Sequence, residues 1–575
     1  MTLDNLQPSI SPTSFGNDNR IYIPFTGFHA LSTYLSWLMD EFGNFIVLLV
    51  SSFSGLFQTK QHCTVPSQPP RLQPKVPFIG HLLRLVVEGT EYLRALHRTT
   101  GLPIFTLPIA GRSYHVVASP HMVHAVQKDY KVFSFNAIIV DVARRIFLFD
   151  KEAMAAFEGT NQSITRNEKR KPSALQMARG QFVKNLRPGF ELDDLLLRFT
   201  DGVLVDVHAH LKSPSDGNVT HLWKRIRTDF STAVARAFWG ARHPFCHNSA
   251  VYWAAMEDFE AGALNLFALP LPFLTARKAN SARSKLLQAL KDYTERDGFQ
   301  DSASFIKCQY EACHDLGTSI MSNGGLGLAF SAIGPITSTA FWMVCYIFSR
   351  PDLLAEVRAE VDSCLNVDEG RSHGQSIRSC TIDTAALNRH CPTLFMCLVE
   401  ILRLSSTQPT FRIVQEDTTL KDPASGVSYE LKKNDVITLI SAGMLDASEL
   451  WGSDHEDFRP ARFDDAASQH IPKKFDVTQP YWMSQAQRAA FVPRGSGVHM
   501  CAGCFFAQEA ILAYTALYVS AYDITDLQGK PLRAPSMSRK LSVSNAKPAS
   551  DVEVCLRPRQ RVENFRYKYK VAQRT

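Results

Sequence analysis

The sequence lacks the features that would place it outside ordinary globular proteins. It has no internal repeat and no low-complexity linker, and its 45% hydrophobic and 20% charged residues exclude a disordered or fibrous chain. The net charge is only +7, and Lys and Arg are not concentrated as in nucleic-acid-binding proteins, so no nucleic-acid partner is expected. The densest basic run, residues 166–171, contains an acid, which is typical of a solvated surface. A docking patch for an acidic partner or an anionic membrane is the alternative.

Cysteine patterns of zinc sites and disulfide frameworks are also missing. The 12 cysteines follow no repeated short spacing. Cys501 and Cys504 form one closely spaced pair, but no second Cys or His pair accompanies them to complete a zinc site. A long chain without such a framework indicates a reducing, cytosol-facing compartment.

The first 60 residues contain two runs without Asp, Glu, Lys or Arg. Residues 21–39 include a proline, whereas residues 42–59 just reach the roughly 18 residues of a transmembrane helix. A basic start and a cleavage site typical of a signal peptide are missing. Acids before the second run and bases after it would keep the rest of the chain in the cytosol. We therefore predict a membrane anchor over residues 1–60; an amphipathic segment lying on the bilayer, or a tail packed on the domain, is the alternative.

Beyond this segment the pattern predicts a hinge and one large domain. Residues 61–78 are rich in proline, which fixes φ and removes amide donors, so they are expected to form an extended, stiff spacer. Residues 79–575 contain no further linker and are predicted to form a single helix-rich domain.

Within the predicted domain, strands come first and helices follow. Residues 104–107 and 114–118 have the composition of strands, and Ser119-Pro120 is typical of a helix start. From there to about residue 410 the pattern is mostly helical. A clear amphipathic helix is predicted to start at Pro351.

One cysteine lies in a setting that suits a metal ligand. The segment 491–503 reads F-V-P-R-G-S-G-V-H-M-C-A-G and places Cys501 in a glycine-rich loop directly before an apolar helix pattern. Backbone amides of such a turn and of a helix N-terminus direct positive charge at the sulfur and favour a thiolate. Gly497 and Gly503 would let the backbone pass close to a flat macrocycle. A lone cysteine in such a loop can equally be a small buried hydrophobic residue, so other motifs have to decide.

Three motifs in sequence order resemble the cytochrome P-450 superfamily. Residues 497–503, G-V-H-M-C-A-G, match the second half of the signature F-x-x-G-x-[RH]-x-C-x-G, although Arg494 stands in place of its Phe. Upstream, residues 400–403 match E-x-x-R, and residues 458–463 match F-x-P-x-R-F. The resemblance runs from about residue 65 to the C-terminal region.

The resemblance implies a mainly α fold with small β-sheets, the cytochrome P-450 fold, and haem as the cofactor. It implies that Cys501 is the axial thiolate of the iron, whose electron push favours O–O cleavage. His499 takes the position of an Arg that pairs with a haem propionate, and Arg412 matches a second propionate contact. It also implies a buried charge network that supports the loop and consists of Glu400, Arg403 and Arg462.

The helix that activates oxygen in the family departs from its pattern, A-G-x-[DE]-T. In the matching stretch, Gly334 falls at the acid and Pro335 at the Thr, so a kink is expected without the usual hydroxyl. Thr337 and Thr339 lie nearby; ordinary hydroxyls on a helix surface are the alternative. We take Gly334, Pro335 and Thr337 as the candidate catalytic positions. The family's W-x-x-x-R helix has no clear match.

This stretch is most similar to the branch that contains steroid 7α-hydroxylases and prostacyclin synthase. The resemblance implies a monooxygenase of fungal biosynthetic type, held at the endoplasmic reticulum membrane with its catalytic domain facing the cytosol. It would take electrons from an NADPH-dependent reductase and oxidise a lipophilic terpenoid, steroid or similar secondary metabolite. The first alternative is a haem-thiolate isomerase or dehydratase that acts on an oxygenated substrate without a reductase. The second is a non-catalytic haem sensor or carrier.

Overall fold

A computed structural model of the chain divides into two units, Met1–Cys63 and Thr64–Thr575. All described residues lie in the second unit, to which the description below refers: 68–73, 81–109, 112–159, 172–212, 219–313, 318–372, 375–440, 448–463, 483–495, 497–559 and 565–571. The predicted anchor, most of the predicted hinge and the basic run 166–171 lie outside these residues.

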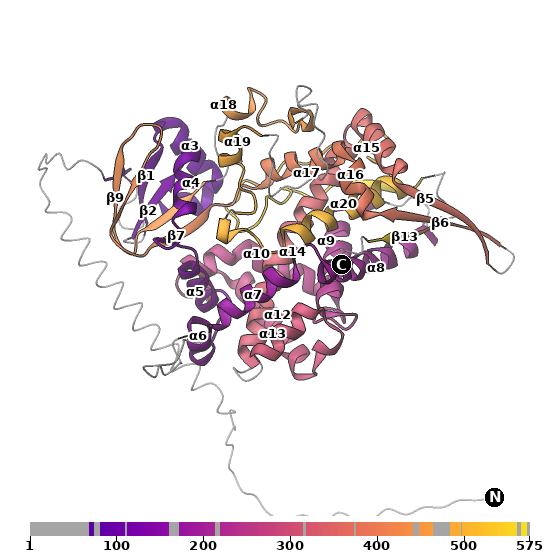
Figure 1. Cartoon of the computed structure of the whole chain (residues 1–575), viewed down its shortest axis with the longest axis horizontal. Helices are drawn as coiled ribbons and strands as arrows, with labels where there is room; N and C mark the ends of the chain where they lie inside the picture. The colour runs from indigo at the N-terminus through magenta and orange to yellow at the C-terminus, as the bar shows by residue number, and fades with distance from the viewer. Residues whose placement is uncertain are drawn as a thin grey trace, which may run out of the picture. The chain divides into compact units, whose positions relative to one another are not determined.

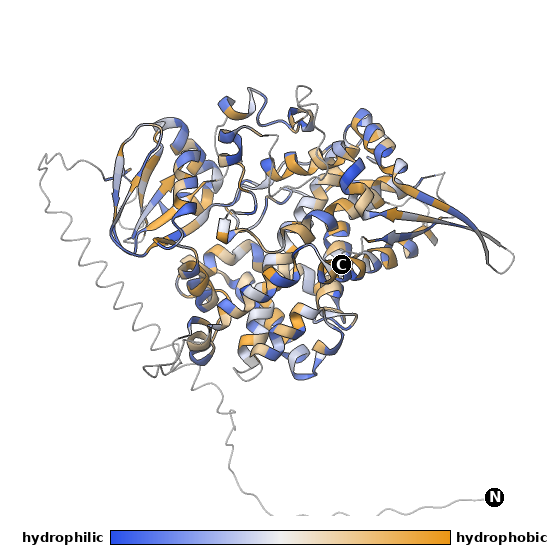
Figure 2. Ribbon diagram, in the orientation of Figure 1, coloured by the Kyte–Doolittle hydropathy of each residue, from blue (hydrophilic) through white to orange (hydrophobic). Residues whose placement is uncertain are grey.

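Helices make up most of the described residues (Figure 1). Their bounds are α2 Leu82–Glu88, α3 Thr90–Thr100, α4 Pro120–Lys128, α5 Asn136–Arg145, α6 Lys151–Glu158, α7 Ala174–Asn185, α8 Phe190–Lys212, α9 Leu222–Trp239, α10 Ser249–Ala268, α11 Pro272–Thr275, α12 Arg277–Glu295, α13 Ser304–Cys313, α14 Thr318–Phe348, α15 Pro351–Ser363, α16 Thr384–His390, α17 Pro392–Ser405, α18 Ser448–Trp451, α19 Gln485–Ala490 and α20 Cys504–Ala521. In Figure 2 many of them carry both hydrophobic and hydrophilic bands, as amphipathic helices around a core do.

The strands form small sheets around this helical body. Their bounds are β1 Ile104–Ile109, β2 Arg112–Val117, β3 Phe133–Ser134, β4 Val219–His221, β5 Leu365–Ser372, β6 Gln375–Asp383, β7 Thr410–Val414, β8 Thr418–Lys421, β9 Ser428–Leu431, β10 Val436–Leu439, β11 Tyr522–Thr525, β12 Glu553–Pro558 and β13 Phe565–Lys570. The largest sheet has the order β1-β2-β10-β7-β3 and lies at one side of the view in Figure 1.

The structure confirms the early strands and the helix starts that the sequence predicts. β1 and β2 pair antiparallel, with Ile104 opposite Val117, and both of these side chains are fully buried. Helix α4 begins at Pro120 and α15 at Pro351, where the missing N–H of proline leaves no hydrogen bond unmade.

The chain is mostly helical up to about residue 410, as predicted, but besides the short strands β3 and β4 it contains one long hairpin that the sequence does not predict. β5 and β6 form a long antiparallel hairpin directly after α15. β6 pairs on its other side, in parallel, with β13 near the C-terminus, and Cys380 lies opposite the fully buried Tyr567. Because the pairing partner lies far along the chain, local periodicity gives little sign of these strands.

The centre of the fold consists of two apolar helices, α14 and α20. α14 packs against α9, α12, α17 and α20. Both helices are long and apolar enough to cross a membrane, but 67% and 94% of their apolar windows are buried in the fold, as in the core helices of a soluble domain. α14 therefore buries much of its middle section, including Gly334 and Thr337, among other helices, whereas Pro335 is partly exposed.

Candidate functional site

The cysteine loop lies between a short 3-10 helix, Gly497–His499, and the start of α20. The Cys501 amide donates to the Arg494 carbonyl at 2.8 Å, and the Arg494 guanidinium donates to the Cys504 carbonyl. Arg494, the residue that departs from the signature, therefore holds the loop from both sides of the cysteine. The Cys501 side chain itself is exposed.

Glycine is required at one turn of this loop and leaves open space at another. Gly495 has φ +71°, and a Cβ there would lie 2.8 Å from the His499 carbonyl oxygen. Gly497 has φ +55°, but a Cβ there would have no atom within 4 Å. A Cβ on Gly503 would lie in ordinary contact, 3.9 Å from the Cys501 sulfur. The loop thus leaves room for a group beside the cysteine.

Positively charged side chains gather around His499 from distant parts of the chain. Arg179 on α7 places Nη1 3.4 Å from His499 Nδ1. Arg412 on β7 is buried and lies over the ring of Phe135 at 4.7 Å, and that ring contacts His499 edge-on. Arg412 also donates to the Phe411 carbonyl at 2.7 Å, and in the described part of the chain neither Arg179 nor Arg412 forms an ion pair with a carboxylate. Among the described residues, the cluster therefore carries positive charge without a counter-ion.

Burial, more than the neighbouring charges, shifts the pKa values of this cluster. Burial, together with the charges of Arg412 and Arg179, lowers the pKa of His499 to about 4. Burial lowers the pKa of Arg412 to about 10. His499 Nε2 is buried and has no hydrogen-bond partner in the described part of the chain. An acceptor with negative charge would satisfy all three side chains.

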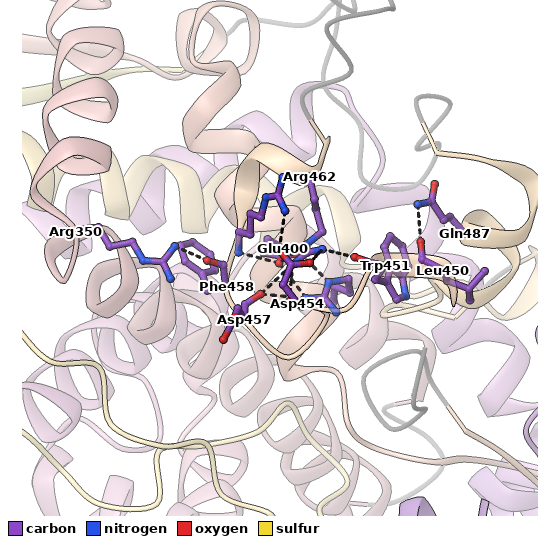
Figure 3. Close-up of polar contacts among 11 residues, drawn as sticks. Arg350, Glu400, Leu450, Trp451, Asp454, Asp457, Phe458, Arg462 and Gln487 are labelled. Atoms are coloured by element: carbon purple, nitrogen blue, oxygen red, sulfur yellow. Dashed lines mark hydrogen bonds and ion pairs between the residues drawn. The ribbon is translucent and has the colours of Figure 1, made fainter. Parts of the chain in front are cut away.

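Behind the loop, a buried charge network joins α17 to the segment around residue 460 (Figure 3). Glu400 is fully buried and accepts from Arg403 Nε at 2.7 Å and Nη2 at 2.9 Å. Arg462 Nε donates to the same carboxylate at 2.7 Å, and the Arg459 amide donates at 3.0 Å. The structure thus brings together the three residues that the motifs single out.

The remaining donors of Arg462 are also satisfied. Its guanidinium contacts Asp454 Oδ1 at 3.2 Å and donates to the carbonyls of Trp451, Asp454 and Asp457. A buried network of this kind stabilises a fold only when every charged group is paired and hydrogen-bonded. Here the network fixes residues 451–462 against α17.

In α14, the candidate catalytic residues face neighbouring helices. A Cβ on Gly334 would lie 2.7 Å from Glu260 Oε1 of α10. Thr337 is fully buried; its hydroxyl donates to the Ile333 carbonyl at 2.7 Å and lies 3.4 Å from Ser231 Oγ on α9. Pro335 lies inside the helix, which continues on both sides.

Two of the residues brought to the site were not predicted from the sequence. Arg179 lies 320 residues before His499, in a helix that carries no W-x-x-x-R pattern. Glu260 has no motif around it, and only the empty acid position at Gly334 hints that a carboxylate comes from elsewhere.

Comparisons with known proteins agree with this fold. Residues 325–551 match the family model described as Cytochrome P-450. The cytochrome P-450 monooxygenase nodJ of Hypoxylon pulicicidum is 24% identical over 540 residues, 92% of this chain and 97% of its own length. The human 7-alpha-hydroxycholest-4-en-3-one 12-alpha-hydroxylase is 21% identical over 495 residues, 80% of this chain and 87% of its own.

A solved structure shares the fold. "Retinoic acid bound cyanobacterial CYP120A1" matches with a TM-score of 0.61 and 18% identity, over 86% of this chain and all of that chain. The family match and the relatives define a haem-thiolate oxidoreductase. Residues 325–551 carry the match to the cytochrome P-450 family, and the chain is similar over most of its length to fungal monooxygenases and to the branch of the 7α-hydroxylases. Such enzymes use haem iron, generally need a redox partner and bind lipophilic substrates.

The residues present fit haem. Its two propionates are carboxylates, which the guanidinium groups of Arg179 and Arg412 and the unpaired Nε2 of His499 can bind. The open side of Gly497 leaves space for a planar group beside Cys501. His499, around which the cationic cluster gathers, lies two residues before the exposed thiol of Cys501, as a haem with an axial thiolate requires.

We predict that Arg412→Gln weakens haem binding. A hydrogen bond to a charged group contributes about 1.5–3 kcal/mol, so the dissociation constant should rise about tenfold to a hundredfold. The haem content per chain, measured after dilution and gel filtration, checks this. Arg112→Gln, at an exposed position of β2, is the matched control and should keep the wild-type content. Equal haem retention in both variants would remove Arg412 from the site.

Proposed function

We propose that the chain is a monooxygenase in which Cys501 ligates the haem iron. The observation that carries this proposal is the uncompensated cluster of Arg179, Arg412 and His499 beside the cysteine loop, which suits a dicarboxylate cofactor. When bound, haem supplies an iron centre that activates dioxygen. The chain's own residues hold the propionates, present the thiolate and keep the loop in place.

The residues around the thiol have separate roles in this proposal. Arg494 fixes the Cys501 amide and the first turn of α20, so the sulfur keeps its direction. Glu400 and Arg462 keep the segment before the loop against α17, a positioning role rather than a chemical one. The absence of a free hydroxyl at Pro335 means that protons must reach the site through water or another side chain.

The substrate that we propose is a lipophilic biosynthetic intermediate, such as a terpenoid, a steroid or a similar secondary metabolite. The names of the relatives support this class: one is a fungal monooxygenase and another hydroxylates a sterol-derived ketone. The isomerase or dehydratase alternative is not favoured by these relatives.

Labelled dioxygen tests the reaction type. The full-length chain is reconstituted with a purified NADPH-dependent reductase, and a panel of sterols and terpenoids is first screened for a substrate-induced spin-state shift. A monooxygenase places one labelled oxygen atom in the product and consumes one NADPH per product. An unlabelled, rearranged product formed without NADPH would instead identify an isomerase or dehydratase.

We further propose that residues 1–60 anchor the enzyme, residues 61–78 form the hinge and residues 79–575 form the catalytic domain, which faces the cytosol at the endoplasmic reticulum. Deleting residues 1–60 should move the protein from the membrane pellet to the soluble fraction. Val47→Asp with Leu49→Asp should act in the same direction, because each acid at a helix centre costs about 2.5–3.5 kcal/mol of insertion free energy. Asp40→Asn is the control that should leave the protein in the pellet. A truncated chain that still sediments with membranes would contradict the anchor.

A further inference from the structure

The central helix α14 contains no Asp, Glu, Lys, Arg or His in its 31 residues. The proposed monooxygenase reaction, on which this inference rests, consumes protons: substrate, dioxygen, NADPH and one proton give hydroxylated product, water and NADP⁺. Proton transfer at a buried site requires a positioned group with an exchangeable proton, or a chain of water that such a group orients. The hydroxyls of α14 around its middle, Ser331, Thr337, Ser338 and Thr339, donate to carbonyls of the helix itself. A carboxyl, amine or imidazole group for α14 therefore has to come from a different element.

A carboxylate from α10 lies against the middle of α14. A Cβ on Gly334 would lie 2.7 Å from Glu260 Oε1 and 3.0 Å from Glu260 Cδ. The Glu260 carboxylate therefore occupies the space that a side chain at position 334 would take. The Glu260 side chain is only 2% exposed. Glycine at 334 is what lets a carboxylate from another helix reach the α14 backbone.

The same position borders the accessible face of α14. Ser331, one turn earlier, is exposed, and Pro335 is partly exposed, whereas Gly334 and Thr337 are buried. Pro335 has no N–H to donate to the Ser331 carbonyl, so this carbonyl is left for water. The Glu260 carboxylate lies against Gly334, the residue directly before Pro335. We call this turn of α14, at which the Ser331 carbonyl lacks its intrahelical donor, the opening.

Two cations hold this carboxylate, and one of them reaches solvent. Arg227 Nη2 donates to Glu260 Oε1 at 2.9 Å, and Lys547 Nζ donates to Oε2 at 2.5 Å. Arg227 is almost completely buried, but the Lys547 side chain is 16% exposed. Burial alone would raise the pKa of Glu260, but the charges of Arg227 and Lys547 outweigh it, so the pKa is lowered. The ionised carboxylate is thus the resting form.

We propose that Glu260 is the positioning residue that supplies α14 with a proton-exchanging carboxylate, and that Lys547 connects it to solvent. Lys547 Nζ gives a proton to Glu260 Oε2 and regains one from solvent water. The carboxyl group then releases its proton to water at the opening beside Ser331 and Pro335 and returns to the carboxylate. Each cycle moves one proton inward and leaves both side chains in their starting charge states.

Variants of the carboxylate and of its space test this role. Glu260→Gln keeps the shape but removes the exchangeable carboxylate, Glu260→Asp keeps the charge on a shorter side chain, and Gly334→Ala pushes the carboxylate away. Glu360→Gln is the matched control, because Glu360 is a partly buried carboxylate that accepts from the Thr393 and Leu394 amides at 2.8 and 3.1 Å, remote from the proposed relay. The full-length chain, loaded with haem, is assayed with purified reductase and no added substrate.

In Glu260→Gln and Gly334→Ala, we expect more of the dioxygen to be reduced to hydrogen peroxide and less of it to water. We also expect NADPH oxidation to be slower. The rate should fall about a hundredfold, the lower end of what a positioned proton-transfer group contributes. The NADPH oxidation rate of Glu260→Asp should lie between the rates of these two variants and the rate of the wild type. The ratio of the rates in normal and heavy water should change only in the Glu260 and Gly334 variants. The reduced carbon-monoxide difference spectrum, recorded before NADPH is added, should be the same in all variants.

A second readout needs no turnover. Because the folded-state pKa of Glu260 is lowered, its ionised form stabilises the fold above the unfolded pKa of about 4.3, and this contribution disappears as the pH falls through the folded pKa. The difference in unfolding free energy between wild type and Glu260→Gln should therefore be large at pH 7 and shrink in acid.

Two results would overturn the proposal. If Glu260→Gln keeps the wild-type peroxide fraction and isotope ratio, or if Glu360→Gln shifts both equally, Glu260 has only a structural role. A wild-type chain without the thiolate-type carbon-monoxide band would refute the proposed function itself, and the inference with it. The two failures are distinguishable because that band does not depend on Glu260.

Discussion

Replacing Cys501 with alanine is expected to abolish the thiolate-type band of the reduced carbon-monoxide difference spectrum and to bring NADPH-dependent oxidation down to background. The substitution removes the sulfur but leaves the backbone of the loop, because its amide still donates to the Arg494 carbonyl. A haem bound without the thiolate loses the electron push that favours O–O cleavage. The expected effect is therefore on the ligand and not on the fold.

Cys504→Ala is the matched control for this prediction. Cys504 lies three positions further along the same segment, but its side chain is buried at the start of α20, whereas Cys501 is exposed. The control should keep the band and most of the activity, with at most a modest loss of stability from the small cavity. A Cys501→Ala protein that kept the band, or a Cys504→Ala protein that lost it, would show that the wrong sulfur is assigned.

The second large effect is expected for Glu400→Ala. This change leaves Arg403 buried with no counter-charge and leaves Arg462 with Asp454 alone, since both arginines donate to the Glu400 carboxylate at 2.7 Å. Breaking a buried charge network by removing one member costs about 3–5 kcal/mol. Total stabilities of folded domains are only about 5–15 kcal/mol, so much of the protein should fail to fold or to retain haem.

Urea unfolding at neutral pH, together with the yield of haem-bound protein, measures this effect. Glu456→Ala is the control, because Glu456 is 58% exposed and pairs with Arg94 and Arg98 on the surface. Surface ion pairs contribute about 0–1 kcal/mol, so this variant should behave nearly as wild type. If Glu400→Ala and Glu456→Ala lose equal amounts of unfolding free energy and of haem-bound protein, the network does not stabilise the segment before the loop.

The sequence predicts the parts of the site that rest on local order. Glu400 and Arg403 share a helix face because they are three residues apart, and Cys501 precedes a helix, so both placements follow from spacing. The first two strands, and the helices that begin at Pro120 and Pro351, can also be predicted from neighbouring residues alone.

Tertiary packing sets the rest, and a single sequence does not reveal it. Arg179 reaches His499 across 320 residues, and Lys547 reaches Glu260 across 287. The hairpin of β5 and β6 is stabilised by a C-terminal strand that no local pattern connects to it. Gly334 alone indicates only a missing acid; the structure shows which carboxylate fills its space.

The role of Arg494 is a further case. The signature has a Phe at this position, and the departure leaves the packing beside the cysteine open when only the sequence is considered. In the structure the Arg494 guanidinium binds the Cys504 carbonyl, while its own carbonyl accepts the Cys501 amide. A charged side chain thus fixes the loop by hydrogen bonds where an aromatic ring would fix it by packing.

X-ray absorption at the iron edge of the purified full-length protein tests the central claim most directly. The account predicts one sulfur neighbour in the first shell of the iron in the wild type, and its loss in Cys501→Ala but not in Cys504→Ala. A first shell that holds only nitrogen and oxygen atoms in the wild-type protein would contradict it.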